Sequence, residues 1–195
     1  MTFAMKGNIK FAVICLMFSG ICDMFDGHVA KLAKRTDREK SFGIQIDSLA
    51  DLVCFGALPA TIGYAVFQNR AAKSYGSFGT AVVIIVISVY VLAALIRLAY
   101  FNVTETELTS KNEKRKYYEG LPVTSVALII PVVYAICVCF NFPLSRIYNK
   151  MLVLISAAFV LKIKTPKLKL RYMIALCLIG LPIIAYIFLS KGALI

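Results

Sequence analysis

The sequence predicts an all-α membrane protein, a polytopic transmembrane helix bundle with about six spans that forms one domain over residues 1–195. Two observations predict this class. First, 60% of the 195 residues are hydrophobic and only 16% are charged, whereas a soluble domain is about 45–50% apolar and about 25% charged. Too few polar side chains remain to cover a surface that faces water. Second, the apolar residues gather in six segments, most of them near the roughly 20 residues that a helix needs to cross a bilayer.

The six segments are predicted to be helices, because an open sheet could not satisfy its backbone hydrogen bonds in lipid. All six cysteines fall inside these segments and none forms a CxxC pair, so we expect them to be structural thiols rather than metal ligands. The fifth segment is short for a membrane span. The segments cover residues 9–25, 42–67, 78–101, 121–140, 151–163 and 172–189.

The net charge of +12 is concentrated in three of the loops that connect the segments. By the positive-inside rule these loops face the cytoplasm, which predicts a multi-pass protein of the cell membrane. The basic charge therefore reflects topology and contact with anionic lipid, and it does not indicate a nucleic acid partner. Fourteen of the 22 Lys and Arg residues lie in these loops: Lys31, Lys34, Arg35, Arg38, Lys40, Lys111, Lys114, Arg115, Lys116, Lys162, Lys164, Lys167, Lys169 and Arg171.

This orientation puts the amino terminus outside, although Lys6 and Lys10 make it a poor segment to export. A signal peptide over residues 1–22 would explain the charge, but no small-x-small cleavage site follows it. The interpretation that we favour is that a preceding transmembrane helix is missing.

Four of the ten acidic residues lie at the predicted cytoplasmic ends of the first two apolar segments: Asp23, Asp26, Asp47 and Asp51. A carboxylate at the centre of a lipid-exposed helix costs about 2.5–3.5 kcal/mol, so these residues need partners. The spacings i, i+3 and i, i+4 place each pair on one helix face. Four ionised carboxylates in one cavity require cations, and oxygen ligands favour Mg²⁺, Mn²⁺ or Ca²⁺, with two divalent ions balancing the charge.

Small residues lie one helical turn from these aspartates. Gly27 follows Asp23, Ala30 follows Asp26, and Gly43 precedes Asp47. Glycine in a helix costs about 1 kcal/mol relative to alanine, so we expect a ligand to approach the backbone closely here. A phosphate-bearing ligand such as a nucleotide diphosphate suits this surface. The alternative is that the aspartates only form ion pairs with nearby basic residues, namely Lys31, Lys34, Arg35 or Arg97.

Two neighbouring stretches resemble the signature of the CDP-alcohol phosphotransferases, D-x2-D-G-x2-A-R-x(n)-G-x3-D-x3-D. The first runs from Asp23-Met-Phe-Asp26-Gly27 to Ala30-Lys31, and the second is Gly43-Ile-Gln-Ile-Asp47-Ser-Leu-Ala-Asp51. Further stretches are similar to the branch that makes phosphatidylserine, and the similarity covers nearly the whole chain. These stretches are residues 48–60, Arg97-Leu-Ala-Tyr-Phe-Asn102, Glu119-Gly120-Leu121-Pro122 and Thr165-Pro166-Lys167.

This resemblance implies a reaction and a role for each matched residue. The family transfers the phosphatidyl group of CDP-diacylglycerol, here to L-serine, using two Mg²⁺ or Mn²⁺ ions. Asp23, Asp26 and Asp47 would hold the metals, and Asp51 would complete the metal site and act as the base. The resemblance also implies a possible homodimer. Gly27, Ala30 and Gly43 would line the nucleotide pocket.

The chain departs from the family pattern in three places. Lys31 stands where the family usually has Arg, which keeps the positive charge but loses the planar bidentate fork. Residues 32–42 form a longer loop than usual and are predicted to be solvated. We expect that the usual first transmembrane helix is missing and that the activity of a chain without it is impaired.

Two residues that are not fixed positions of the signature carry weaker signals. Arg97 could bind the carboxylate of serine or a phosphate, or extend to the membrane surface. His28 is expected to lie at the interface rather than on a metal. Two rival functions remain open: the same chemistry with glycerol 3-phosphate or inositol phosphate as the acceptor, and cation transport along the aspartates.

Overall fold

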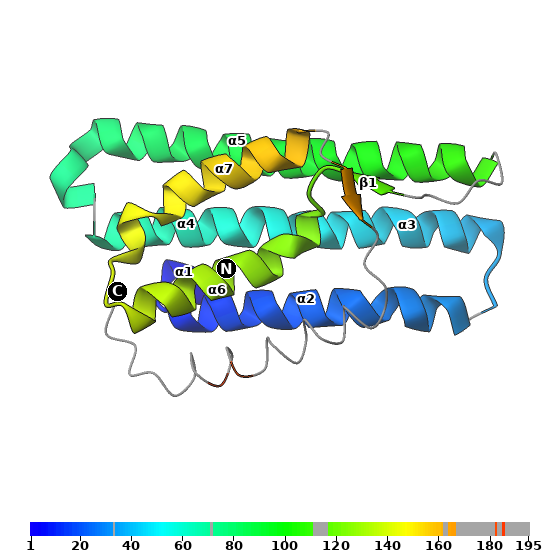
Figure 1. Ribbon diagram of the computed structural model, residues 1–195, viewed down its shortest axis with the longest axis horizontal. Coiled ribbons are helices and arrows are strands. Elements are labelled where there is room, and N and C mark those ends of the chain that lie inside the picture. The colour runs from blue at the N-terminus through cyan, green and yellow to red at the C-terminus, as the bar shows by residue number, and fades with distance from the viewer. Residues whose placement is uncertain are drawn as a thin grey trace.

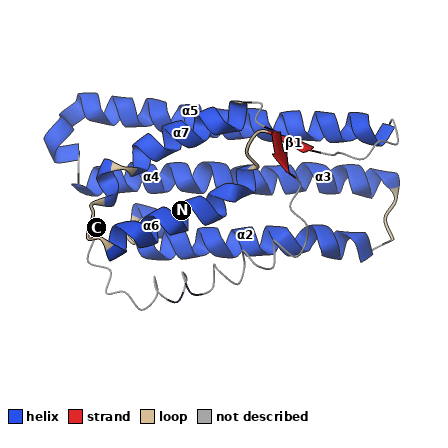
Figure 2. Ribbon diagram, in the orientation of Figure 1, coloured by secondary structure: helices blue, strands red, loops and turns tan. Residues whose placement is uncertain are grey.

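The computed structural model describes residues 1–32, 34–70, 72–110, 117–161 and 164–166, together with positions 182 and 185. The predicted sixth apolar segment lies outside these ranges. The described part is almost entirely helical (Figure 2), and its only strands in these ranges are two three-residue segments, β1 (Tyr117–Glu119) and β2 (Lys164–Pro166), which pair in antiparallel register. The predicted helical class is therefore confirmed for the described residues.

Three long helical stretches run side by side along the longest axis of the molecule (Figure 1). After the short α1 (Thr2–Met5), the first stretch is α2 (Ile9–Leu32). The second is continuous from α3 (Asp37–Asp51) through a π-helical turn, η1 (Leu52–Ala57), into α4 (Leu58–Arg70). The third is α5 (Ala72–Ser110), which is kinked at Gly76, where φ is +60°.

Two shorter apolar helices cross the long ones at an angle (Figure 1). The first, α6 (Val126–Cys139), follows the 3₁₀ turn η2 (Val123–Ser125) and packs on α2. The second, α7 (Tyr148–Val160), follows the 3₁₀ turn η3 (Leu144–Arg146) and packs on α5.

Among the described helices, two stretches are long and apolar enough to cross a membrane: Asp37–Asn69 and Tyr75–Glu107. Large apolar side chains on these helices face outward, including Phe78, which is 80% exposed, and Ile85. Side chains of this kind are stable on an outer surface when lipid covers it.

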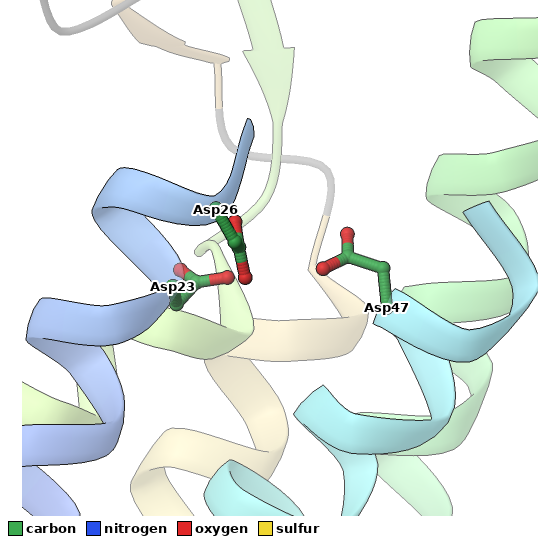
Figure 3. A group of neighbouring side chains, drawn as sticks. All are labelled: Asp23, Asp26 and Asp47. Carbon is green, nitrogen blue, oxygen red and sulfur yellow. The ribbon is translucent and has the colours of Figure 1, made fainter. Parts of the chain in front are cut away.

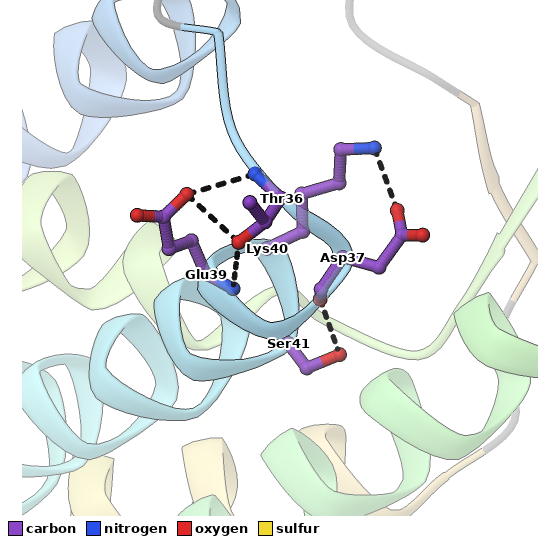
Figure 4. Close-up of polar contacts among 5 residues, drawn as sticks. All are labelled: Thr36, Asp37, Glu39, Lys40 and Ser41. Atoms are coloured by element: carbon purple, nitrogen blue, oxygen red, sulfur yellow. Dashed lines mark hydrogen bonds and ion pairs between the residues drawn. The ribbon is translucent and has the colours of Figure 1, made fainter.

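Two connections are shorter than the sequence predicts. Residues 32–42 are predicted to be a solvated loop, but α3 already begins at Asp37. Thr36 and Glu39 form a capping box, in which the Thr36 hydroxyl accepts the Glu39 N–H at 3.3 Å and the Glu39 carboxylate accepts the Thr36 N–H at 2.8 Å (Figure 4). These bonds satisfy N–H groups that a helix start leaves unpaired. The connection between the predicted segments 78–101 and 121–140 is also shorter, because α5 continues to Ser110.

The described residues form a hydrophobic core toward one end of the long helices. Its buried residues come from the start of α2, from η1 and α4, from the middle of α5, and from α6 and α7. No residue of α3 is buried. Tyr148 illustrates how the core satisfies its polar atoms, because its buried hydroxyl donates a hydrogen bond to the Pro59 carbonyl at 3.1 Å. Toward the end of α2 and along α3, the side chains that the structure describes are exposed or half-buried.

Close packing of α2 on α6 depends on Gly20. A Cβ placed on Gly20 would lie 2.5 Å from the Ala127 Cβ, well inside van der Waals contact. We therefore expect Gly20→Ala to destabilise the protein, because overpacking costs about 1–3 kcal/mol and exceeds the roughly 1 kcal/mol that alanine gains in helix propensity. Thermal unfolding in detergent micelles measures the change. The double variant Gly20→Ala with Ala127→Gly should regain part of the loss, and an unchanged melting temperature for Gly20→Ala alone would refute this contact.

Candidate active site

Three aspartates converge between α2 and α3. Asp23 and Asp26 come from α2 and point across the gap toward Asp47 of α3 (Figure 3). One carboxylate oxygen of each residue lies within 4.8 Å of the others. Asp23 is half-buried, whereas Asp26 and Asp47 are exposed. The structure thus brings together three residues that the sequence singles out from helical spacing alone.

Asp51 lies one turn after Asp47, at the last position of α3, and is half-buried. Its carboxyl group lies near that of Asp23 on the facing helix. All four aspartates named from the sequence are therefore neighbours: three form one group, and the fourth lies beside Asp23.

The donor set of this cluster fits a hard divalent cation. Two oxygens on opposite sides of an octahedral Mg²⁺ stand about 4.2 Å apart, since each metal–oxygen bond is about 2.1 Å. The aspartate oxygens are separated by at most 4.8 Å, so small side-chain movements would bring them to bonding distance. Carboxylate oxygens are also the ligands that Mg²⁺ and Mn²⁺ prefer over softer donors.

Gly43 leaves the backbone of α3 bare beside the aspartate cluster. It lies in α3 one turn before Asp47, and a Cβ on it would stand 3.3 Å from Nη1 of Arg35. The Arg35 guanidinium therefore lies against the bare backbone at Gly43, one turn before Asp47. The side chains of residues 27–33 lie outside the described set, so the predictions for Gly27, His28, Ala30 and Lys31 stay predictions.

Arg97 is only 5% exposed and lies against the connector that follows β1. Its Nε donates to the Leu121 carbonyl at 3.0 Å and its Nη2 to the Gly120 carbonyl at 3.2 Å. Gly120 has a φ of +84°, and a Cβ there would lie 2.9 Å from the Leu161 carbonyl oxygen. The described bonds of Arg97 thus join α5 to this connector, and its contact with a substrate stays a prediction.

The sequence interpretation assigned no role to two polar contacts made by α5. The Asn102 amide donates to the Ser48 hydroxyl at 2.7 Å, and the Tyr90 hydroxyl donates to the Phe55 carbonyl at 2.6 Å. Both partners lie close to Asp51 in the sequence. A polar side chain in a long apolar segment is the signal that could have identified them.

Comparison with known proteins decides the family. A profile of the CDP-alcohol phosphatidyltransferases matches residues 1–163, which is most of the chain. The chain belongs to the CDP-alcohol phosphatidyltransferase family. The four aspartates described above lie within the matched residues.

Similar curated proteins share one name, CDP-diacylglycerol–serine O-phosphatidyltransferase. The relative from Saccharomyces cerevisiae is 40% identical over 121 residues, which cover 60% of this chain and 39% of the relative. The relative from Helicobacter pylori is 29% identical over 168 residues, covering 83% and 64%. The relative from Methanocaldococcus jannaschii is 29% identical over 181 residues, covering 89% and 75%. The chain thus spans less than two thirds of the length of the first two relatives.

The geometry predicts that Asp47 contributes to cation binding. We expect Asp47→Asn to weaken Mn²⁺ binding at least tenfold, because the amide removes one of the charged oxygen donors that face the α2 pair. Electron paramagnetic resonance of free Mn²⁺ during titration measures the affinity. Asp37→Asn is the matched control, because Asp37 is exposed and forms its ion pair with Lys40 at 2.9 Å. Equal affinity in the two variants would exclude Asp47 from the site.

Proposed function

We propose that this protein transfers the phosphatidyl group of CDP-diacylglycerol to the hydroxyl of L-serine, giving phosphatidylserine and CMP. The observation that carries the proposal is the convergence of Asp23, Asp26, Asp47 and Asp51 between α2 and α3. Membership of the family supports the chemistry. The shared name of the similar proteins supports serine as the acceptor.

In this proposal Asp23, Asp26 and Asp47, together with Asp51, hold two Mg²⁺ or Mn²⁺ ions. Bound divalent cations would stabilise negative charge on the diphosphate and on the departing CMP. Asp51 accepts the proton of the serine hydroxyl, whose oxygen then attacks the lipid-linked phosphorus. The bond from that phosphorus to the oxygen of CMP breaks, and CMP leaves with the bonding electron pair.

The half-buried position of Asp51 supports its role as the base. A general base must reach the proton that it removes, and Asp51 lies deeper than the exposed Asp26 and Asp47, beside Asp23. We also propose that Gly27, Ala30 and Gly43 leave room for the nucleotide. Lys31 and Arg97 are proposed to bind the charged groups of the substrates.

The membrane arrangement belongs to the same proposal. Six spans would place the aspartates at the cytoplasmic side of the cell membrane, where serine is dissolved and the CDP headgroup meets water, while the acyl chains stay in lipid. The position of the aspartates supports this arrangement, because they lie where α2 and the α3–α4 stretch leave the buried core. The protein is proposed to work as a single domain, and homodimerisation is part of the same expectation.

Release of CMP tests the proposed reaction. In liposomes that contain CDP-diacylglycerol and Mn²⁺, we expect CMP release that depends on L-serine and is at least tenfold slower with glycerol 3-phosphate or inositol phosphate. The Methanocaldococcus jannaschii relative serves as the positive control. Faster release with a phosphorylated acceptor would overturn serine as the substrate. No release with any acceptor, while the control is active, would overturn the transferase proposal.

Replacement of Asp51 tests the base. We expect Asp51→Asn to lower kcat by about 10²–10⁴-fold, which is the usual contribution of a positioned general base. Because the amide keeps the size of the side chain, CDP binding should remain within a few-fold of that of the unmodified protein, as measured by isothermal titration calorimetry. The exposed Asp37→Asn variant is the control and should keep its activity. Turnover of Asp51→Asn at the unmodified rate would remove Asp51 as the base.

A further inference from the structure

The π-helical turn η1 begins at Leu52, directly after Asp51, and ends where α4 enters the core. A π-helical turn contains one residue more than the corresponding α-helical turn. Each residue turns an α-helix by about 100°, so conversion of η1 to an ordinary α-helical turn would rotate α3 by about that angle relative to α4. Because α4 is fixed in the core, this rotation would move Asp51 away from Asp23. The direction of Asp51 therefore depends on the π-helical turn.

Tyr90 of α5 bonds directly to this turn. Its side chain is completely buried, and its hydroxyl donates a hydrogen bond of 2.6 Å to the main-chain carbonyl of Phe55. A buried hydroxyl or carbonyl without a hydrogen-bond partner destabilises the fold, so the tyrosine and the carbonyl hold each other in place. The Phe159 ring of α7, with its centroid 5.8 Å from that of Tyr90, supports the tyrosine.

Side chains pack closely around the π-helical turn η1. A Cβ on Gly56 would lie 3.1 Å from Cδ1 of Leu52 and 3.7 Å from the Ala94 Cβ of α5. The buried Phe55 ring reaches α2, where its Cε1 is 4.0 Å from the position of a Cβ on Gly20. The turn thus contacts both α5 and the helix that carries Asp23.

A second contact holds the other side of Asp51. Asn102 of α5 donates to the Ser48 hydroxyl at 2.7 Å, and Ser48 lies three residues before Asp51, whereas Phe55 lies four residues after it. Hydrogen bonds from α5 therefore fix the chain on both sides of the aspartate.

We propose that Tyr90 is a positioning residue, which holds the π-helical turn so that Asp51 faces Asp23 and the aspartate cluster. The inference rests on the proposed function for the role of Asp51 in turnover. Tyr90 touches no substrate in this proposal and acts through the Phe55 carbonyl.

The variant Tyr90→Phe tests the proposal by removing one oxygen atom and keeping the ring. Tyr148→Phe is the matched control, because Tyr148 is also fully buried and donates to a main-chain carbonyl, that of Pro59 in α4, outside the π-helical turn. We expect Tyr90→Phe to lower kcat about tenfold with KM for CDP-diacylglycerol within twofold, and to weaken Mn²⁺ binding at least threefold. Tyr148→Phe should keep both values within twofold, although both variants lose a buried hydrogen bond and some thermal stability.

Two measurements distinguish failure of the Tyr90 proposal from failure of the proposed function. If the unmodified protein releases no CMP, the proposed function fails, and Mn²⁺ affinity still decides the role of Tyr90. Amide hydrogen exchange of residues 52–57 in metal-free protein should accelerate in Tyr90→Phe more than in Tyr148→Phe. Equal Mn²⁺ affinity and equal exchange in the two variants would overturn the proposal. A loss of kcat that follows thermal stability equally in both variants would also overturn it.

Discussion

Mutual repulsion among carboxylates is the constraint on which this site depends. Oxygens of Asp23, Asp26 and Asp47 lie within 4.8 Å of one another, and Asp51 lies beside Asp23. At this separation one pair of full charges repels by about 1 kcal/mol in water and by about 3 kcal/mol at the intermediate dielectric near a protein surface. Several such pairs would push α2 and α3 apart unless cations neutralise them or the rest of the fold holds the helices. The fold holds the two helices in place, and the proposed divalent ions would neutralise the carboxylates.

The fold holds the helices from the opposite half of the bundle. The start of α2 packs on α6 through Gly20, and α4 is buried between its neighbours, while α3 has no buried residue of its own. Asp23 and Asp26 lie beyond the buried part of α2, whereas Asp47 and Asp51 lie at the end of α3 that joins η1 and the buried α4. The direction of Asp51 is therefore set at η1, where α3 meets the core.

Local spacing predicts the aspartate cluster well, because residues three or four positions apart share a helix face wherever the helix lies. Composition and the length of the apolar segments predict the helical class in a similarly local way. The apolar pattern places the start of α3 too late, since the signal of the capping box, Thr36-x-x-Glu39, lies among charged residues that look like a solvated loop. The π-helical turn, the bond from Tyr90 to Phe55 and the contact of Arg97 with Gly120 could not be predicted. The two hydrogen bonds join residues at least 20 positions apart, and all three features depend on how the helices pack.

The central claim is that α2 and α3 together form a divalent cation site for phosphatidyl transfer. Anomalous X-ray diffraction from crystals of the protein grown with Mn²⁺ and CDP tests it most directly, because the signal locates each metal without reference to activity. The account predicts metal peaks between α2 and α3, about 2.1–2.2 Å from oxygens of Asp23, Asp26 and Asp47 and adjacent to the diphosphate. Peaks elsewhere, or CDP bound away from these aspartates, would contradict it.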